Sequence, residues 1–111
     1  MGSRCVIRFG DNGGAVAGIY QHYEGSPEVV RQNMSAFFEA VKEQCPRDTR
    51  FGDPSYLSAR YIVWQAAKFA RNNKALDFRS LGIVPADSTE SWTYDVACVD
   101  EEAFPVVTEV E

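Results

Sequence analysis

The residues best suited to chemistry lie in one short run, in which His22, the only histidine of the chain, stands near two tyrosines and is followed by Glu24. A histidine titrates near neutral pH and therefore suits general acid or base catalysis, in which Tyr20, Tyr23 or Glu24 would orient or polarise its ring. His22 and Glu24 are the candidate catalytic residues. A metal site would need more ligands than one histidine supplies, so no metal ligands are predicted.

The same run has two interpretations without catalysis. In the first, the histidine and the tyrosines brace the junction between a hairpin and a helix, because buried tyrosine and histidine side chains normally find hydrogen-bond partners. In the second, Tyr20, His22, Tyr23 and Glu24 form a binding surface, because such side chains combine a large contact area with polar tips. The sequence leaves all three interpretations open.

The three cysteines argue against a zinc site, because they are widely separated and no C-x-x-C spacing occurs. Cys5 and Cys98 fall in predicted strands with apolar neighbours, where a free cysteine behaves as a small buried hydrophobe. A nucleophilic cysteine paired with His22 would instead require a lowered thiol pKa in a polar setting. Nothing near Cys5, Cys45 or Cys98 in the sequence supplies that setting.

The glycines near the N-terminal end do not form a phosphate-binding loop. Gly10, Gly13, Gly14 and Gly18 fit neither the Rossmann nor the Walker spacing, and a hairpin turn explains most of them. Gly18 marks either a bulge or a close contact within a strand. No cofactor is predicted.

Composition places the chain among folded globular domains. With 111 residues, 45% of them hydrophobic and 24% charged, one core can form without a second domain. No apolar run is long enough for a membrane span, and the N-terminal residues lack the basic region, apolar stretch and cleavage site of a signal peptide, so a cytoplasmic protein is expected. Residues 1–3 are interpreted as a tag remnant or a disordered start, and a single domain is expected over residues 4–111.

Charge is concentrated in the last third of the chain. Residues 77–111 contain nine of the sixteen acidic residues and one basic residue, within a net charge of −5. Such a field repels phosphate, so direct binding of nucleic acid is not expected, whereas a basic protein surface is a suitable partner. The residues assigned to this acidic patch are Asp95, Asp100, Glu101 and Glu102.

A hairpin is predicted at the N-terminal end. Residues 4–9 alternate between apolar and polar types, an Asp-Asn-Gly-Gly turn follows, and the return strand is expected over 15–23. Counting by twos along that strand places Tyr20 and His22 on one surface and Gln21 on the other.

Two helices are predicted in the middle of the chain. The first begins at Ser26 and Pro27, where the serine would cap the helix and the proline suits its first turn, and it ends at Pro46. The second begins at Pro54 and continues to residue 72 or 73. Its wide apolar arc indicates burial on more than one side, either between the sheet and the first helix or at a homodimer contact.

The last third returns to strand patterns, over 81–85, 92–99 and 104–110, with Pro105 typical of an edge strand or of the start of a strand. The resulting order, ββααβββ, predicts an α+β domain. We expect a single antiparallel sheet with both helices packed on one face.

Three segments form a combined pattern: the run from Ile19 to Glu28 with a helix beginning at its proline, the helix start Ser55 to Tyr61, and the late strand Trp-Thr-Tyr-Asp-Val. In this combination the chain resembles a family of small uncharacterised proteins of bacteria and their phages over nearly its whole length. The most recognisable family segment is of the type Tyr-x-His-Tyr-Asp-Gly-Tyr-Pro. Its matching residues here are Tyr20, His22, Tyr23, Gly25 and Pro27. Glu24 and Ser26 depart from the pattern, and the second departure removes an aromatic ring. The resemblance implies the fold and a phage or prophage origin, and it supplies no activity.

The sequence therefore favours a small, non-catalytic binding or regulatory protein that acts through contacts with a protein partner. One alternative is an acidic inhibitor that occupies the nucleic-acid site of a host protein, an anti-defence role suited to a phage gene. The other is a small enzyme that uses His22 as its acid or base.

Overall fold

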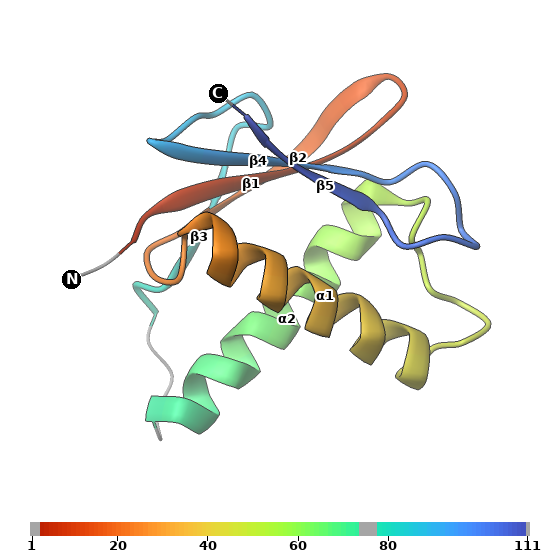
Figure 1. Ribbon diagram of the computed structural model, residues 1–111, viewed down its shortest axis with the longest axis horizontal. Coiled ribbons are helices and arrows are strands. Elements are labelled where there is room, and N and C mark those ends of the chain that lie inside the picture. The colour runs from red at the N-terminus through yellow and green to blue at the C-terminus, as the bar shows by residue number, and fades with distance from the viewer. Residues whose placement is uncertain (1–2, 74–77, 111) are drawn as a thin grey trace.

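Two helices cover one face of a five-stranded sheet in the computed structural model (Figure 1). The structure describes residues 3–73 and 78–110, so the expectation for residues 1 and 2 lies outside the described residues. The elements are β1 (Cys5–Asp11), β2 (Gly14–Gln21), α1 (Pro27–Gln44), α2 (Pro54–Asn73), β3 (Leu81–Val84), β4 (Trp92–Ala97) and β5 (Val106–Val110). The predicted α+β class and the order ββααβββ are confirmed.

The sheet is mixed, and the prediction of a purely antiparallel sheet was wrong. The strand order is β3-β2-β1-β4-β5, and β1 runs parallel to β4 while the other neighbours are antiparallel. Because β3 and β4 both run in the direction of β1, their connection crosses over the sheet and does not form a hairpin. The polar stretch between these strands gives no sequence signal that separates a crossover from a turn.

Gly18 marks a close contact beneath this crossover. A Cβ atom at Gly18 would lie 2.7 Å from the carbonyl oxygen of Pro85, at the start of the connection. The irregularity in the β1–β2 pairing falls between Phe9 and Gly10, and Gly18 pairs in register with Arg8. Of the two roles expected for Gly18, the structure therefore places the close contact there, and the extra residue of the bulge is Val16, two positions earlier on the same strand.

The core lies between the sheet and the helices and is rich in aromatic rings. Phe9 of β1 contacts Tyr61 of α2 with ring centroids 5.9 Å apart, and Tyr61 contacts Phe37 of α1 at 5.3 Å. Each of these side chains is at most 1% exposed. One buried cluster thus joins β1 to both helices, which places all three elements rigidly around the site described below.

The second helix is buried on two sides and open on a third. Tyr61 faces the sheet, and Trp64 meets Phe37 of α1 with ring centroids 5.7 Å apart, whereas Val63 remains 71% exposed. The wide apolar arc was expected to contact either the sheet and the first helix or a second copy of the chain. In the structure α2 packs against the sheet and α1.

The two helix starts are capped differently. Ser26 occupies the cap position of α1, but its side chain makes no capping hydrogen bond, contrary to the prediction. Its backbone is extended and its carbonyl accepts from the N–H of Val30 at 2.9 Å, so the first turn closes without the hydroxyl. At α2 the carboxylate of Asp53 accepts from the N–H of Tyr56 at 3.1 Å, as a cap residue does.

Candidate functional site

Three half-buried rings lie together where β2 leaves the sheet. The hydroxyl of Tyr20 lies 2.8 Å from Nδ1 of His22, and the rings of His22 and Tyr23 meet edge to face with centroids 4.7 Å apart. Tyr23 in turn contacts Phe69 of α2 at 6.3 Å. The N–H of His22 donates to the carbonyl of Ser80 at 2.9 Å, which prolongs the pairing of β2 with β3. We call Tyr20, His22 and Tyr23 the aromatic surface.

Glu24 ties the turn after β2 to both helices. Its backbone adopts a left-handed conformation with φ of 61°, and its Oε1 accepts from Nδ2 of Asn33 at 2.9 Å and from Nζ of Lys68 at 2.8 Å. Lys68 also donates to Oδ1 of Asn33 at 2.7 Å, so the three side chains close a ring of polar contacts. The carboxylate of Glu24 therefore has a structural task.

Gln21 holds the same turn from the core side. Its side chain is fully buried, and its Nε2 donates to the carbonyls of Tyr23 at 2.7 Å and Glu24 at 3.2 Å. Its Oε1 accepts from the hydroxyl of Tyr61 and from Nε2 of Gln65 at 3.0 Å. Every polar atom of the Gln21 side chain is thus engaged, and Gln21 braces the junction for which bracing by His22 and the tyrosines was one of three interpretations of the sequence.

Gly25 completes the turn by allowing another segment to approach. A Cβ atom at Gly25 would lie 2.2 Å from the carbonyl oxygen of Ser3, and the Gly25 carbonyl accepts from the hydroxyl of Tyr94 at 2.7 Å. Burial raises the pKa of Tyr94 to about 12, so the phenol remains a neutral donor. The glycine of the Glu-Gly-Ser-Pro turn is therefore required by packing against the N-terminal end.

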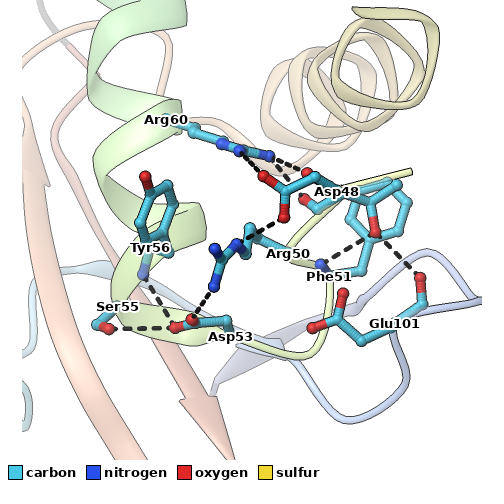
Figure 2. Close-up of polar contacts among 9 residues, drawn as sticks. Asp48, Arg50, Phe51, Asp53, Ser55, Tyr56, Arg60 and Glu101 are labelled. Carbon is cyan, nitrogen blue, oxygen red and sulfur yellow. Dashed lines mark hydrogen bonds and ion pairs between the residues drawn. The ribbon is translucent and has the colours of Figure 1, made fainter. Parts of the chain in front are cut away.

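A second cluster of polar contacts joins the loop before α2 to the helix (Figure 2). Nε of Arg50 lies 2.8 Å from Oδ1 of Asp48, at ion-pair distance without hydrogen-bond alignment, and its Nη1 lies 3.3 Å from Oδ2 of Asp53. The Arg50 guanidinium stacks over the ring of Tyr56 at 4.3 Å, and Arg60 donates to the carbonyl of Asp48 at 2.6 Å. The neighbouring charge of Asp48 raises the pKa of Arg50. The loop is held in one conformation.

Three of the four predicted acidic-patch residues lie in the turn between β4 and β5, which contacts the loop before α2. Asp100, Glu101 and Glu102 are exposed, and the N–H of Glu102 donates to Oδ1 of Asp100 at 2.9 Å. Thr49 donates to the carbonyl of Glu101 at 3.0 Å, so the turn is anchored to the loop before α2. We call Asp100, Glu101 and Glu102 the acidic turn.

Asp95, the fourth residue, lies apart from the acidic turn, within β4 on the face away from the helices. Arg8 of β1 binds it with both ends of the guanidinium, Nε to Oδ1 at 2.7 Å and Nη2 to Oδ2 at 3.1 Å. The hydrogen bond from Arg8 to Asp95 raises the pKa of the guanidinium. The charge of Asp95 is therefore compensated locally.

Cys5 of β1 and Cys98, which directly follows β4, are poor nucleophiles. Cys5 and Cys98 are fully buried, and burial raises the pKa of each thiol to about 12. This is the opposite of the lowered pKa that a nucleophilic thiol requires. Cys45 is partly exposed and lines a groove of about 310 Å³ between α1 and α2.

Sequence reasoning brought some of these residues together and missed others. Strand alternation placed Tyr20 beside His22, as the structure has them. The buried partners Asn33 and Gln65 and the partly buried Lys68 were missed, because nothing local separates them from the solvated residues of a helix. The available signal for this buried polar network was Gln21, a polar residue that lies two positions after Ile19 and therefore on the same, core-facing side of β2.

Residues 3–73 and 78–110 contain neither a metal-binding cluster nor a membrane-spanning helix. Among these residues no three histidine, cysteine or acidic side chains lie close enough together to hold a metal ion. Neither helix described there is sufficiently apolar along its length to traverse a bilayer.

Comparison with known proteins gives no relative. No family model matches the chain, and neither the curated proteins nor the solved structures contain a significant match.

Proposed function

We propose that this chain is a small, non-catalytic binding or regulatory protein, associated with a phage or prophage, that acts through contacts with a protein partner. The observation that carries the proposal is the framework beneath the aromatic surface. Gln21 fixes the backbone of Tyr23 and Glu24, and Glu24 is tied to both helices. Rings held in place before binding lose less conformational entropy when a partner docks.

The engagement of Glu24 favours binding over catalysis. A general base must reach the proton that it abstracts, and the carboxylate of Glu24 already accepts from Asn33 and Lys68. A small enzyme that uses His22 remains the alternative, favoured by the contact between its Nδ1 and the hydroxyl of Tyr20 at 2.8 Å. An activity that appears in substrate screening and disappears in His22→Ala would support that alternative.

The test of the main proposal is affinity capture from bacterial host lysate with immobilised wild type, His22→Ala and a control. Val63→Ala is a suitable control because Val63 is exposed on α2, away from the aromatic surface. We expect one partner to be retained by wild type and Val63→Ala and lost by His22→Ala, with thermal melts showing all three folded. A partner retained equally by all three, or no specific partner, would contradict the proposal.

The acidic turn supports a second candidate, an inhibitor that occupies the basic nucleic-acid site of a host protein. Its three exposed carboxylates are carried on a turn anchored by Thr49, and complementary fields accelerate the encounter with a basic surface. This candidate differs from the first because it predicts binding that weakens steeply with added salt.

The two candidates are separated by charge reversal at two places. The test variant changes Asp100, Glu101 and Glu102 to lysine. The control variant changes the exposed α1 residues Glu28, Glu39 and Glu43 to lysine, which shifts net charge equally. An inhibitor loses its partner only in the first variant, and nucleic acid competes for the same partner. Equal losses in both variants would indicate nonspecific electrostatics and contradict the candidate.

A further inference from the structure

Among the residues that the structure describes, no strand pairs with the outer edge of β5, which has high β propensity. β5 forms one border of the sheet and pairs with β4 on its inner side. Its sequence, Val-Val-Thr-Glu-Val, contains four β-branched residues in five, and it has no proline or lysine of the kind that commonly protects an edge. An unprotected edge presents backbone donors and acceptors to a further strand.

The hydrogen bonds of the sheet show which groups point outward. The N–H of Cys98 donates to the carbonyl of Gly10, so this end of β4 directs the backbone groups of alternate residues, including Val96, toward β1. The backbone N–H and C=O groups of the intervening residues of β4, Thr93, Asp95 and Ala97, point toward β5. Their partners in β5 are Val106, Thr108 and Val110. The N–H and C=O groups of Val107 and Glu109 therefore face away from the sheet.

These outward groups are complementary to themselves. When two β5 edges meet antiparallel with a two-fold axis at Thr108, Val107 of each copy faces Glu109 of the other. Each such pair exchanges two N–H to C=O hydrogen bonds. Thr108 faces the second copy's Thr108, and Val106 faces its Val110. No donor meets a donor, which is the condition for a closed two-fold contact.

The side chains fit the same register. The pairs of Val106 with Val110 and of Thr108 with Thr108 are non-hydrogen-bonded pairs, in which β-branched side chains pack closely. This contact would cover Val106, which is 65% exposed. Glu109, on the helix side, carries its counter-charge with it, since its Oε1 lies 3.9 Å from Nη2 of Arg31. The pairing therefore does not leave that carboxylate without a cation.

We propose that a second copy of this chain binds along β5 in this register and joins the two five-stranded sheets into one continuous sheet. The inference is independent of the aromatic surface and of the acidic turn, which use other residues. The contact is short, so we expect a dimer that dissociates on dilution and not an obligate one.

The decisive measurement is analytical ultracentrifugation over about 1 to 300 µM at physiological salt, where long-range repulsion is screened. Thr108→Lys and Thr108→Glu each place like charges face to face across the two-fold axis. We expect each variant to dissociate at least about fivefold more readily than wild type. An equimolar mixture of the two should restore the dimer, because lysine then faces glutamate.

Thr89 provides the matched control, because it is an exposed threonine in the connection between β3 and β4. Thr89→Lys and Thr89→Glu should leave the dimer unchanged. A second measurement uses Thr108→Cys, which brings two thiols face to face at a spacing suited to a disulfide. Oxidation should give a covalent dimer in that variant, and no comparable product in Thr89→Cys or wild type.

Three outcomes would overturn the proposal. The first is a wild type that remains monomeric at the highest concentration. The second is a dimer whose dissociation is unchanged by Thr108→Lys and Thr108→Glu. The third is an equimolar mixture of these two variants that does not restore the dimer. Growth beyond a dimer that is abolished by Ile83→Lys would indicate head-to-tail pairing of β5 with β3, in which Ile83 is 82% exposed. That result would also overturn the two-fold contact.

Discussion

Replacement of Gln21 by methionine tests whether the buried polar network holds the turn that carries the aromatic surface. Methionine has nearly the same length and volume but cannot make the four hydrogen bonds of the glutamine. Each such bond contributes a net ~1 kcal/mol to stability. We therefore expect Gln21→Met to lower the free energy of unfolding by about 3 to 4 kcal/mol.

That loss is large for a domain of this size. It is a substantial part of the roughly 5 to 15 kcal/mol by which small domains are stable, and it corresponds to a fall in melting temperature of about 12 to 16 °C. The measurement is urea denaturation followed by circular dichroism, with calorimetry for the melting temperature. Gln32→Met is the control, because Gln32 is exposed on α1 and its loss should change stability by less than about 0.5 kcal/mol.

A double-mutant cycle distinguishes a network from separate contacts. Gln65→Met removes a partner of Gln21, and the double variant removes both sides of that contact together. The double variant should lose less stability than the sum of the single variants, because no orphaned amide remains between them. A loss below about 1 kcal/mol for Gln21→Met, or strict additivity with Gln65→Met, would refute the reasoning.

Three further predictions concern other parts of the fold. In native protein a maleimide should label Cys45 alone, with Cys5 and Cys98 reacting only on denaturation, as read by mass spectrometry; fast labelling of either buried thiol would contradict the assignment. The N–H of Tyr56 lowers the pKa of Asp53, so its carboxylate stabilises the fold at neutral pH and loses that effect as pH falls below the ordinary value of 3.8 through the folded pKa. The stability advantage of wild type over Asp53→Asn should shrink in that range, and an advantage independent of pH would count against it. Gly18→Ala should cost about 1 to 3 kcal/mol of unfolding free energy, because its Cβ would meet the Pro85 carbonyl at 2.7 Å, whereas Gly82→Ala, with its nearest neighbour at 3.9 Å, should be tolerated; similar melts would refute the close approach.

The sequence predicted those features that are encoded locally. Strand alternation gave the two faces of β2, and Pro27 and Pro54 marked the starts of both helices at the residues where the structure has them. Pro105 correctly indicated an edge strand next to it. Each of these signals depends on a backbone preference of one residue or on a period of two residues.

Features that depend on distant segments were not predicted. The parallel pairing of β1 with β4 follows from a crossover whose sequence resembles an ordinary polar turn. The framework of the site also escaped prediction, because Asn33, Lys68 and Gln65 are typical surface residues until the fold buries them. Gln21 offered a signal, as a polar residue in the core pattern of its strand, but no role was predicted for it.

The parallel pairing of β1 with β4 also determines when the chain can fold during synthesis. The ion pair between Arg8 and Asp95 joins residues 87 positions apart, and β5 attaches to the sheet through β4. The β1–β2 hairpin and both helices therefore leave the ribosome while one side of β1 is still unpaired and the core still lacks Tyr94, Val96 and Cys98. Contacts of such long sequence separation form late and slowly. A nascent chain that stalls before Trp92 presents an unpaired strand and apolar surface, the features that lead to aggregation and to chaperone binding.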